Sequence, residues 1–305
     1  MEKKCPICSS NNGFSGYIFE KNNFKKCLNC GSLFSRAIYN TKDLEKTYND
    51  VYFREDYKKG GGFDYFSNKE EKIKSFLEKL RIISEFIFPF KNLEILDIGC
   101  AAGYFLEVAK RNGFNVYGIE ISKEASAFAN KEFGIKIIAP DLLSISSENK
   151  YDVITMFQVL EHLPFPKEQL MKVYDLLKPG GILFIEVPNF FSVDTLFDFE
   201  IKKRVFSVPY HLSLFSPRGL KQLINSVGFK IIEQRFYFSS VIGCKIKKIL
   251  NVLKPYFELR TKEMDIKKNS QILNRSFPRS FYKKIISYIL PGSNMMIVCK
   301  KDKIN

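Results

Sequence analysis

The stretch ILDIGCAAGYFLEVAKR, residues 95–111, runs from an apolar segment through a glycine turn into a segment with helical spacing. Asp97 ends the apolar segment, and Gly99 and Gly103 enclose the turn. A glycine loop between a strand and a helix is a setting in which nucleotides bind. Gly99 permits a sharp turn and the close approach of a ligand, and Gly103 lets the helix begin against the strand. The stretch therefore predicts an α/β fold with a ligand at this turn.

A carboxylate follows the loop at the distance expected for a ribose contact. Glu120 ends the next apolar segment, about 20 residues beyond the loop, where it can accept both ribose hydroxyls. The loop has no Gly-Lys-Ser/Thr for a phosphate, and Asp97 would repel a pyrophosphate but attract a cation. Two isolated glycines are more often an ordinary tight turn. The combination indicates a nucleoside site, and NAD is not the expected ligand.

Seven apolar segments alternate with connections, several of them long enough for a helix, as in a mostly parallel sheet with crossover helices. They are residues 93–98, 115–119, 135–139, 151–157, 181–187, 230–236 and 294–300. A helix is expected over residues 69–88, because apolar residues recur there at helical spacing and Pro89 follows.

Four motifs resemble those of class I S-adenosylmethionine-dependent methyltransferases in order and spacing. They are ILDIGCAAGYFLEVAKRNGFNVYGIEIS, FQVLEHLPFP, LLKPGGILFIEVPN and HLSLFSPRGLKQLINSVGFKI. The resemblance covers roughly residues 70–236 and implies a Rossmann-like, seven-stranded sheet that ends in an antiparallel hairpin of residues 230–236 and 294–300. Ala101 stands where the family has its middle glycine, and we expect this variant to be tolerated.

The same resemblance implies which residues contact S-adenosylmethionine. Asp97 and Gly99 would hold its amino-acid end, and Glu120 its ribose. The expected cofactor residues, with adenine contacts at 121, 141 and 142, are Asp97, Gly99, Gly103, Glu120, Ile121, Asp141, Leu142 and Gln158.

The chain has two histidines, and each is a candidate acid–base residue. Methyl transfer needs in-line approach of a nucleophile and, where the nucleophile is a hydroxyl, removal of its proton. His162 follows the segment 151–157, and His211 opens the motif HLSLFSP. Either could instead be a structural histidine. Ubiquinone-type O-methyltransferases carry a glutamate where Gln158 stands, so a magnesium site, which would use that carboxylate, is not expected.

Four cysteines predict a structural zinc site in a module of residues 1–40. Cys5-x2-Cys8 and Cys27-x2-Cys30, 18 residues apart, have the spacing of a zinc ribbon. Four thiolates leave no open position on zinc for a catalytic water. Similar modules precede methyltransferase domains in bacterial enzymes that include sugar C-methyltransferases, where the module helps to hold the substrate's nucleotide.

The rest of the chain divides into a helical linker or lid, residues 41–90, and a methyltransferase domain, residues 91–305, with a basic insertion at 237–292. Of the net charge of +15, residues 245–284 carry +9. Such an insertion could lie on an anionic membrane, clamp a diphosphate or simply be a solvated helical face. No nucleic-acid motif accompanies the charge, so nucleic acid is not the expected partner.

A cytoplasmic protein is expected, peripheral to the membrane if the insertion binds lipid, since the N-terminus lacks a signal-peptide core. The first functional hypothesis is S-adenosylmethionine-dependent methyl transfer to a small or lipid-linked anionic metabolite, foremost a sugar nucleotide or surface-glycan precursor. The alternative within enzymes is an O-methyltransferase on a quinone or phenolic lipid, with His162 as the base. The alternative outside enzymes is a non-catalytic binding protein, in which the zinc ribbon recruits a partner and the methyltransferase fold is a relic without activity.

Overall fold

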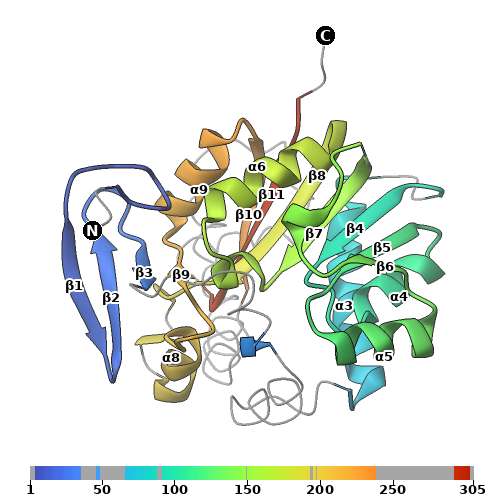
Figure 1. Cartoon of the computed structure of the whole chain (residues 1–305), viewed down its shortest axis with the longest axis horizontal. Coiled ribbons are helices and arrows are strands. Elements are labelled where there is room, and N and C mark those ends of the chain that lie inside the picture. Colours follow the sequence, from blue (N-terminus) through green and yellow to red (C-terminus); the bar gives the residue numbers. More distant parts are fainter. Residues whose placement is uncertain are drawn as a thin grey trace, which may run out of the picture.

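A seven-stranded sheet forms the centre of the molecule (Figure 1). The computed structural model describes residues 4–35, 46–48, 66–87, 91–148, 150–192, 195–196, 198–237 and 292–302. The strand order is β10-β11-β8-β7-β4-β5-β6, in which β11 is antiparallel to both of its neighbours and the others are parallel. The strands are β4 (Glu94–Ile98), β5 (Asn115–Ile119), β6 (Ile137–Ala139), β7 (Tyr151–Phe157), β8 (Leu177–Pro188), β10 (Lys230–Tyr237) and β11 (Asn294–Lys300). The predicted Rossmann-like sheet with its terminal antiparallel hairpin is confirmed.

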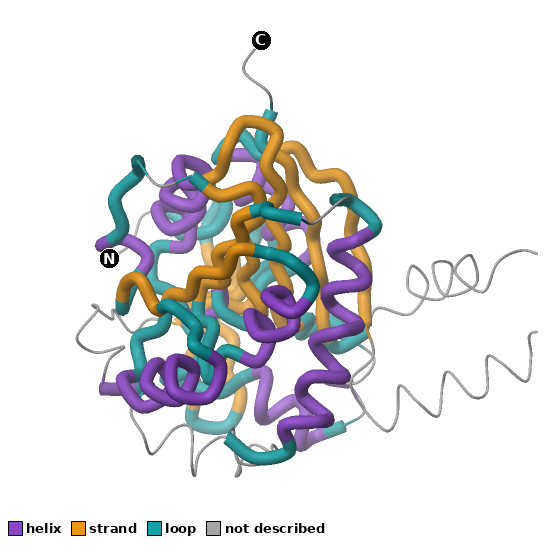
Figure 2. The backbone as a smooth tube through the Cα atoms, turned by 90° about the vertical axis from the view of Figure 1, so that its right-hand side faces the viewer, coloured by secondary structure: helices purple, strands orange, loops and turns teal. Residues whose placement is uncertain are grey.

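Helices cover both faces of this sheet (Figure 2). One apolar core lies between the sheet and the helices α3 (Lys69–Ser84), α4 (Tyr104–Arg111) and α5 (Lys123–Phe133). The second core lies on the opposite face, beneath α6 (Pro166–Leu176) and α9 (Pro217–Ser226). Cys100 and Cys299 are buried in these cores, while Cys244 lies outside the described residues. Helix α3 is shorter than predicted, because the N–H of Glu85 closes its last turn onto the carbonyls of Ile82 and Ile83.

The cysteine-bearing module shares a sheet with the rest of the chain. Its strands β1 (Phe14–Phe19), β2 (Asn22–Cys27) and β3 (Leu33–Ser35) are antiparallel, and β9 (Ser213–Leu214) pairs with β3 as the fourth strand. A small core of the module packs on α8 (Phe199–Val205), where Phe206 contacts Phe19 and Phe24. The module is therefore joined to the larger domain by strand pairing as well as by side-chain contacts.

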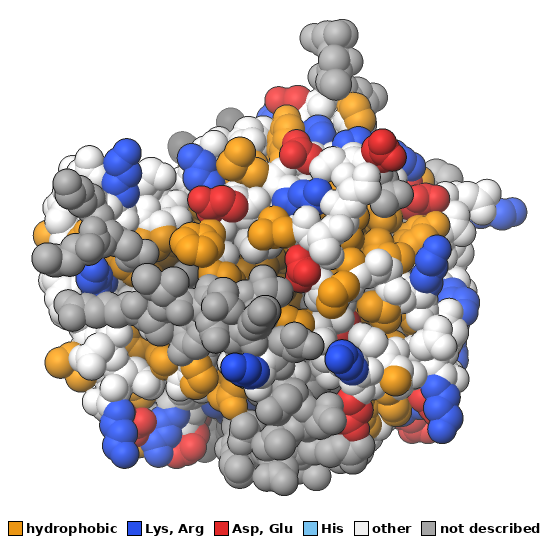
Figure 3. Space-filling model, viewed as in Figure 1, with side chains coloured by type: hydrophobic (Ala, Val, Ile, Leu, Met, Phe, Trp, Pro, Cys, Tyr) orange, Lys and Arg blue, Asp and Glu red, His pale blue; other side chains and the backbone are white. Residues whose placement is uncertain are grey.

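Residues 238–291 of the predicted basic insertion lie outside the described residues, as do residues 41–45, 49–65 and 88–90 of the predicted lid. On the face drawn in Figure 3, Lys and Arg side chains occur singly or in small groups among acidic ones. Within the part of the chain that the structure describes, no helix is long and apolar enough to cross a membrane.

Candidate active site

The glycine loop connects β4 to α4 with two close contacts that only glycine allows. Gly99 has φ of 68°, and a Cβ there would lie 2.6 Å from Val159 Cγ2. Gly103 has φ of 76°, and its Cβ would lie 2.9 Å from Ala129 Cβ. Ala101 is also left-handed, with φ of 47°, a conformation that costs a non-glycine residue about 1 kcal/mol or more. The Ala101 N–H donates to Glu120 Oε2 at 2.8 Å, and this bond offsets the strain.

Glu120 lies at the end of β5 with both carboxylate oxygens facing backbone donors. Oε1 accepts from the Ser122 N–H and Oε2 from the Ala101 N–H, each at 2.8 Å. Burial raises the pKa of Glu120, and these N–H groups oppose the rise. A carboxylate has about four acceptor sites, so one on each oxygen is left for a further donor. Two adjacent hydroxyls of a ribose fit this arrangement.

Asp97 is buried directly before the loop and suits a cationic ligand. Its Oδ1 accepts from the Thr155 hydroxyl at 2.6 Å, which ties the ends of β4 and β7 together. Burial raises the pKa of Asp97 to about 7, and the charge of Lys79 opposes this rise. A positive ligand beside the carboxylate would lower that pKa again. S-adenosylmethionine has an ammonium and a sulfonium group, and these positive charges suit a site with the two buried carboxyls of Asp97 and Glu120.

The expected adenine contacts lie at the ends of the next two strands. Asp141 Oδ1 accepts from the Ser144 N–H at 3.0 Å and caps η2 (Leu142–Ser144), in which Leu142 is buried. Ile121 is partly exposed between Glu120 and α5.

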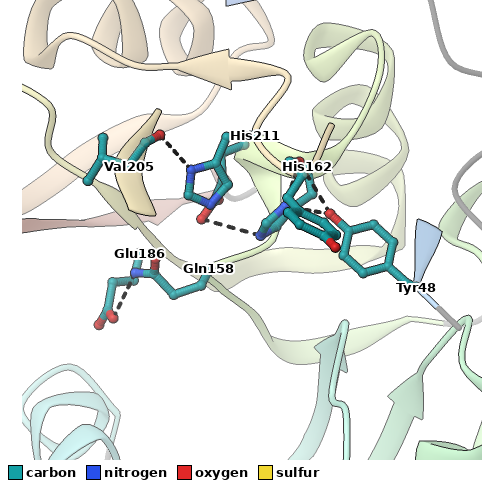
Figure 4. Close-up of polar contacts among 8 residues, drawn as sticks. Tyr48, Gln158, His162, Glu186, Val205 and His211 are labelled. Atoms are coloured by element: carbon teal, nitrogen blue, oxygen red, sulfur yellow. Dashed lines mark hydrogen bonds and ion pairs between the residues drawn. The ribbon is translucent and has the colours of Figure 1, made fainter. Parts of the chain in front are cut away.

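The Gln158 side chain is held by Glu186. Its Nε2 donates to Glu186 Oε1 at 3.1 Å (Figure 4). Its backbone N–H donates to the Glu186 carbonyl at 2.8 Å. The same Oε1 pairs with Lys79 at 2.9 Å. The structure thus shows Gln158 in a polar network at the ends of β7 and β8.

The two histidines lie together, with ring centroids 4.8 Å apart (Figure 4). His162 is in η3 (Leu160–His162), which follows the Val159 that packs on Gly99, so the pair borders the cofactor loop. His162 Nδ1 lies 2.8 Å from the Tyr210 carbonyl, and His211 Nδ1 lies 2.8 Å from the Val205 carbonyl. A carbonyl only accepts, so each Nδ1 carries the proton and each Nε2 has a free lone pair.

Burial sets the protonation state of the pair. It lowers the pKa of His162 to about 3, with a smaller contribution from His211, and it also lowers the pKa of His211. Both rings are therefore neutral near pH 7. The Tyr48 hydroxyl lies 2.6 Å from His162 Nδ1 and donates to the Tyr210 carbonyl at 3.2 Å.

Glu161 lies against this pair and is fully buried. Neither of its carboxylate oxygens has a hydrogen-bond partner among the described residues, and Oε1 lies 3.8 Å from His162 Nε2. Burial raises the pKa of Glu161 to about 8. One oxygen donor and two imidazoles, within 4.8 Å of one another, are a poor set for magnesium, which prefers oxygen ligands.

The four cysteines of the module converge at one point. Cys5 Sγ lies 3.9 Å from Cys30 Sγ, and Cys8 Sγ lies 3.7 Å from Cys27 Sγ. Zn–S bonds of about 2.3 Å in a tetrahedron separate sulfurs by about 3.8 Å, so the set fits a zinc ion. A hydrogen bond with the Cys5 thiol is the main cause that lowers the pKa of Cys30 to about 5. Zinc would displace the proton that Cys5 and Cys30 share and bind the cysteines as thiolates.

Three residues of the candidate active site carry no signal in the sequence that could have identified them. Tyr48 is one of a series of tyrosines in the expected lid, and packing is the commoner role for any single one. Lys79 is one of many helical lysines, and Tyr210 contributes a backbone carbonyl. Glu161 stands inside a motif that the resemblance includes, but only burial distinguishes it. These positions depend on contacts between distant segments.

The comparisons with known proteins agree with this geometry. The model of the methyltransferase domain family matches residues 65–234. The ubiquinone biosynthesis O-methyltransferase of Ralstonia nicotianae is 33% identical over 103 residues, which are 32% of this chain and 43% of that protein. The protein of the same name from Caulobacter vibrioides is 35% identical over 108 residues, 33% of this chain and 43% of its own. The chain thus spans less than half the length of these two relatives.

Solved structures share the fold. A SAM-dependent methyltransferase of Archaeoglobus fulgidus has a TM-score of 0.52 at 20% identity, over 80% of this chain and 97% of its own. A structure of the Haloferax volcanii Trm112 methyltransferase activator in complex with a methyltransferase gives 0.53 at 11% identity, over 83% of this chain and 99% of the matched chain. The family model covers more than half of the sequence and spans the glycine loop, Glu120 and both histidines. The chain therefore belongs to the methyltransferase domain family.

Proposed function

We propose that this chain transfers the methyl group of S-adenosylmethionine to a hydroxyl oxygen of a phenolic or quinol acceptor. The observation that carries the proposal is the pair of neutral imidazoles beside the glycine loop, of which His211 has an Nε2 without a partner among the described residues. When bound, the cofactor supplies an electrophilic methyl group on a sulfonium sulfur. Asp97 and the loop would hold its charged end, Glu120 the ribose, and the segments at Ile121 and Asp141 the adenine.

His211 is the better candidate for the proton acceptor. Its Nδ1–H is fixed on the Val205 carbonyl, and its Nε2 has no partner among the described residues. His162 Nδ1 contacts both Tyr210 and Tyr48, and its Nε2 faces the buried Glu161 Oε1 at 3.8 Å. His211 Nε2 would accept the proton of the acceptor hydroxyl when that oxygen takes up the methyl group. The resulting imidazolium would lower the pKa of the nearby Glu161, and the carboxylate formed would in turn stabilise the imidazolium.

The basicity of the site favours a phenol over an aliphatic alcohol. Burial lowers the pKa of both histidines below the ordinary 6.5, so the pair is a weak base. A phenol has a pKa of about 10, whereas an aliphatic hydroxyl is close to water at about 15.7. The proton transfer is therefore much less uphill from a phenol. The names of the curated relatives, ubiquinone biosynthesis O-methyltransferases, support the same acceptor class.

A sugar nucleotide is the second candidate acceptor. The likeness of the cysteine module to modules of sugar methyltransferases suggested this acceptor. Strand β3 of the module pairs with β9, which lies just after His211. For either acceptor, a lipid-linked form could use the basic insertion at 237–292 to contact an anionic membrane.

The test uses zinc-loaded full-length protein and methyl-labelled S-adenosylmethionine. We expect label in catechol-type phenols rather than nucleotide sugars, and a loss of about 100-fold or more in kcat for His211→Gln with the affinity for S-adenosylhomocysteine kept. His162→Gln is the matched comparison, and we expect the smaller loss there. Label in nucleotide sugars alone would overturn the phenolic assignment. A folded protein that takes up no S-adenosylhomocysteine would instead support the non-catalytic binding protein.

A further inference from the structure

We propose that the cysteine module positions the histidine pair, so that zinc controls methyl transfer from outside the acid–base site. The module would be a part of the acceptor site and not only an appendage. The inference rests on the proposed function only where it gives the pair a role in catalysis. It is carried by hydrogen bonds that lead from the second pair of cysteines to both imidazoles.

The second CxxC turn continues directly into β3. The Gly31 N–H donates to the Cys27 carbonyl at 2.9 Å, and the Cys27 N–H donates to the Ser32 carbonyl at 3.0 Å. Cys30 lies inside this turn, and β3 begins at Leu33. An ion bound by Cys27 and Cys30 therefore fixes the direction in which β3 leaves the turn. Small zinc modules often depend on the metal for folding, so β3 would lose this constraint without it.

Strand β3 holds β9 in place. Leu33 lies opposite Leu214 and Phe34 opposite Ser213 in an antiparallel pair. The Ser35 N–H extends the ladder with a bond to the Leu212 carbonyl at 2.8 Å. Strand β9 has two residues, and in the described part of the chain β3 is its only partner strand. So short a strand has no stability of its own, and its position depends on β3.

The Leu212 peptide connects β3 to the histidine pair. Its carbonyl accepts from Ser35, and its N–H donates to the Glu161 carbonyl at 2.8 Å. His211 directly precedes it, and the Tyr210 carbonyl holds His162 Nδ1–H. The module thus holds the end of the segment that carries His211. The same segment orients His162 through the Tyr210 carbonyl.

Buried serines lock the module onto α9. Ser32 Oγ accepts from the Ser216 N–H at 3.0 Å, and Ser216 Oγ donates to the Cys30 carbonyl. A Cβ at Gly219 would lie 2.1 Å from Ser32 Oγ, whereas its next neighbours, Ser216 Oγ and Cys30 Sγ, are at 3.1 and 3.3 Å. A single methyl group at position 219 would therefore push the module away from α9.

The first experiment removes zinc from the full chain with a chelator and records the side-chain ¹H–¹⁵N spectrum of the histidines. The chain has two histidines, so a His162→Gln variant assigns both. With zinc, we expect two neutral rings protonated at Nδ1. Without zinc, we expect both rings to move toward the Nε2–H form common in water, with a change in S-adenosylhomocysteine affinity below about twofold. Zinc added back should restore the spectrum, and an unchanged spectrum in the zinc-free protein would overturn the proposal.

The second experiment displaces the module while zinc stays bound. We expect Gly219→Ala to give the same histidine changes and to lower kcat by about tenfold or more, with near-native cofactor affinity. The double variant Ser32→Ala/Gly219→Ala removes the oxygen at 2.1 Å and should restore part of both signals. Lys221→Ala, an exposed site on the same helix, is the control and should change neither. Gly219→Ala with a native histidine spectrum would contradict the coupling; should this variant not fold, zinc removal still decides.

The readouts separate this inference from the proposed function. If His211→Gln kept its activity while zinc removal still altered both histidine signals, the assigned function would fail and the coupling would stand. If His211→Gln lost activity while zinc removal left the histidine signals native, the coupling would fail and the function would stand.

Discussion

Replacing Glu120 with Gln tests the cofactor site most directly, because the side chain keeps its shape and loses its charge. Each oxygen of Glu120 accepts one backbone N–H at 2.8 Å, and the residue is 6% exposed. A glutamine has one oxygen, so either the Ala101 or the Ser122 N–H would face an NH₂ group. A hydrogen bond to a charged group contributes about 1.5–3 kcal/mol, and we expect the free energy of unfolding to fall by about this amount.

The affinity for S-adenosylhomocysteine should fall by a similar free energy. The ribose hydroxyls are proposed to donate to the same two oxygens, and Glu120→Gln removes one of them together with the charge. A loss of about 1.5–3 kcal/mol corresponds to a Kd raised about 10- to 150-fold. Calorimetric titration at pH 7.5 measures this, and urea unfolding of the same samples measures the stability.

Glu132→Gln is the matched control, because Glu132 is an exposed carboxylate on the neighbouring helix α5. We expect its Kd to stay within about twofold of the native value and its stability within about 0.5 kcal/mol. A folded Glu120→Gln protein with native affinity would refute the assignment of Glu120 to the ribose. A loss of stability without a loss of affinity would mean that Glu120 only accepts hydrogen bonds from the backbone of the loop and does not contact the ribose.

Three further predictions follow from the loop, the buried carboxyl and the cysteines. Gly99→Ala should abolish measurable S-adenosylhomocysteine binding, because its Cβ would meet Val159 Cγ2 at 2.6 Å; Gly113→Ala, also left-handed but with its nearest contact at 3.8 Å, should affect stability alone, and equal affinities would count against the steric argument. The pKa of Glu161 rises from 4.5 to about 8 on folding, so its protonated form stabilises the fold below pH 4.5 and this contribution is lost as the pH rises to 8. In urea titrations between pH 4.5 and 8, the free energy of unfolding of the native protein should therefore fall relative to that of Glu161→Gln. If the two proteins showed the same dependence on pH, the raised pKa of Glu161 would be excluded. Zinc removal should lower the unfolding temperature by about 5–15 °C in calorimetry, since a structural zinc contributes several kcal/mol and each shifts the midpoint by about 2–4 °C; an unchanged midpoint would mean that the thiolates hold no structural ion.

Local patterns were enough to predict the main sheet. All seven predicted apolar segments became its strands, and residues 104–111 became α4 as expected. The glycine loop was also predictable, because the strand, turn and helix that define it are contiguous in the chain. The cysteine cluster followed from its spacing in the same way. In each case the residues that meet in space are neighbours in sequence or belong to one repeating pattern.

Only part of the histidine site could be predicted from the sequence. His162 and His211 were candidates because they are the only histidines, but nothing in the sequence indicated that their rings lie 4.8 Å apart. The tautomers, the lowered pKa values and the choice of His211 as the proposed base depend on the carbonyls of Tyr210 and Val205 and on burial. These arise from loops whose course is set by packing.

The sequence by itself determined the fold class, the glycine loop with its two carboxyls and the four-thiolate cluster, because periodicity and short spacings are local properties of a chain. Only the tertiary structure decided that Tyr48, Glu161 and the two histidines share one site, and that β3 of the cysteine module pairs with β9 beside it. Strand pairing and burial between segments far apart in the chain have no local pattern, since their energy exists only once the chain has folded.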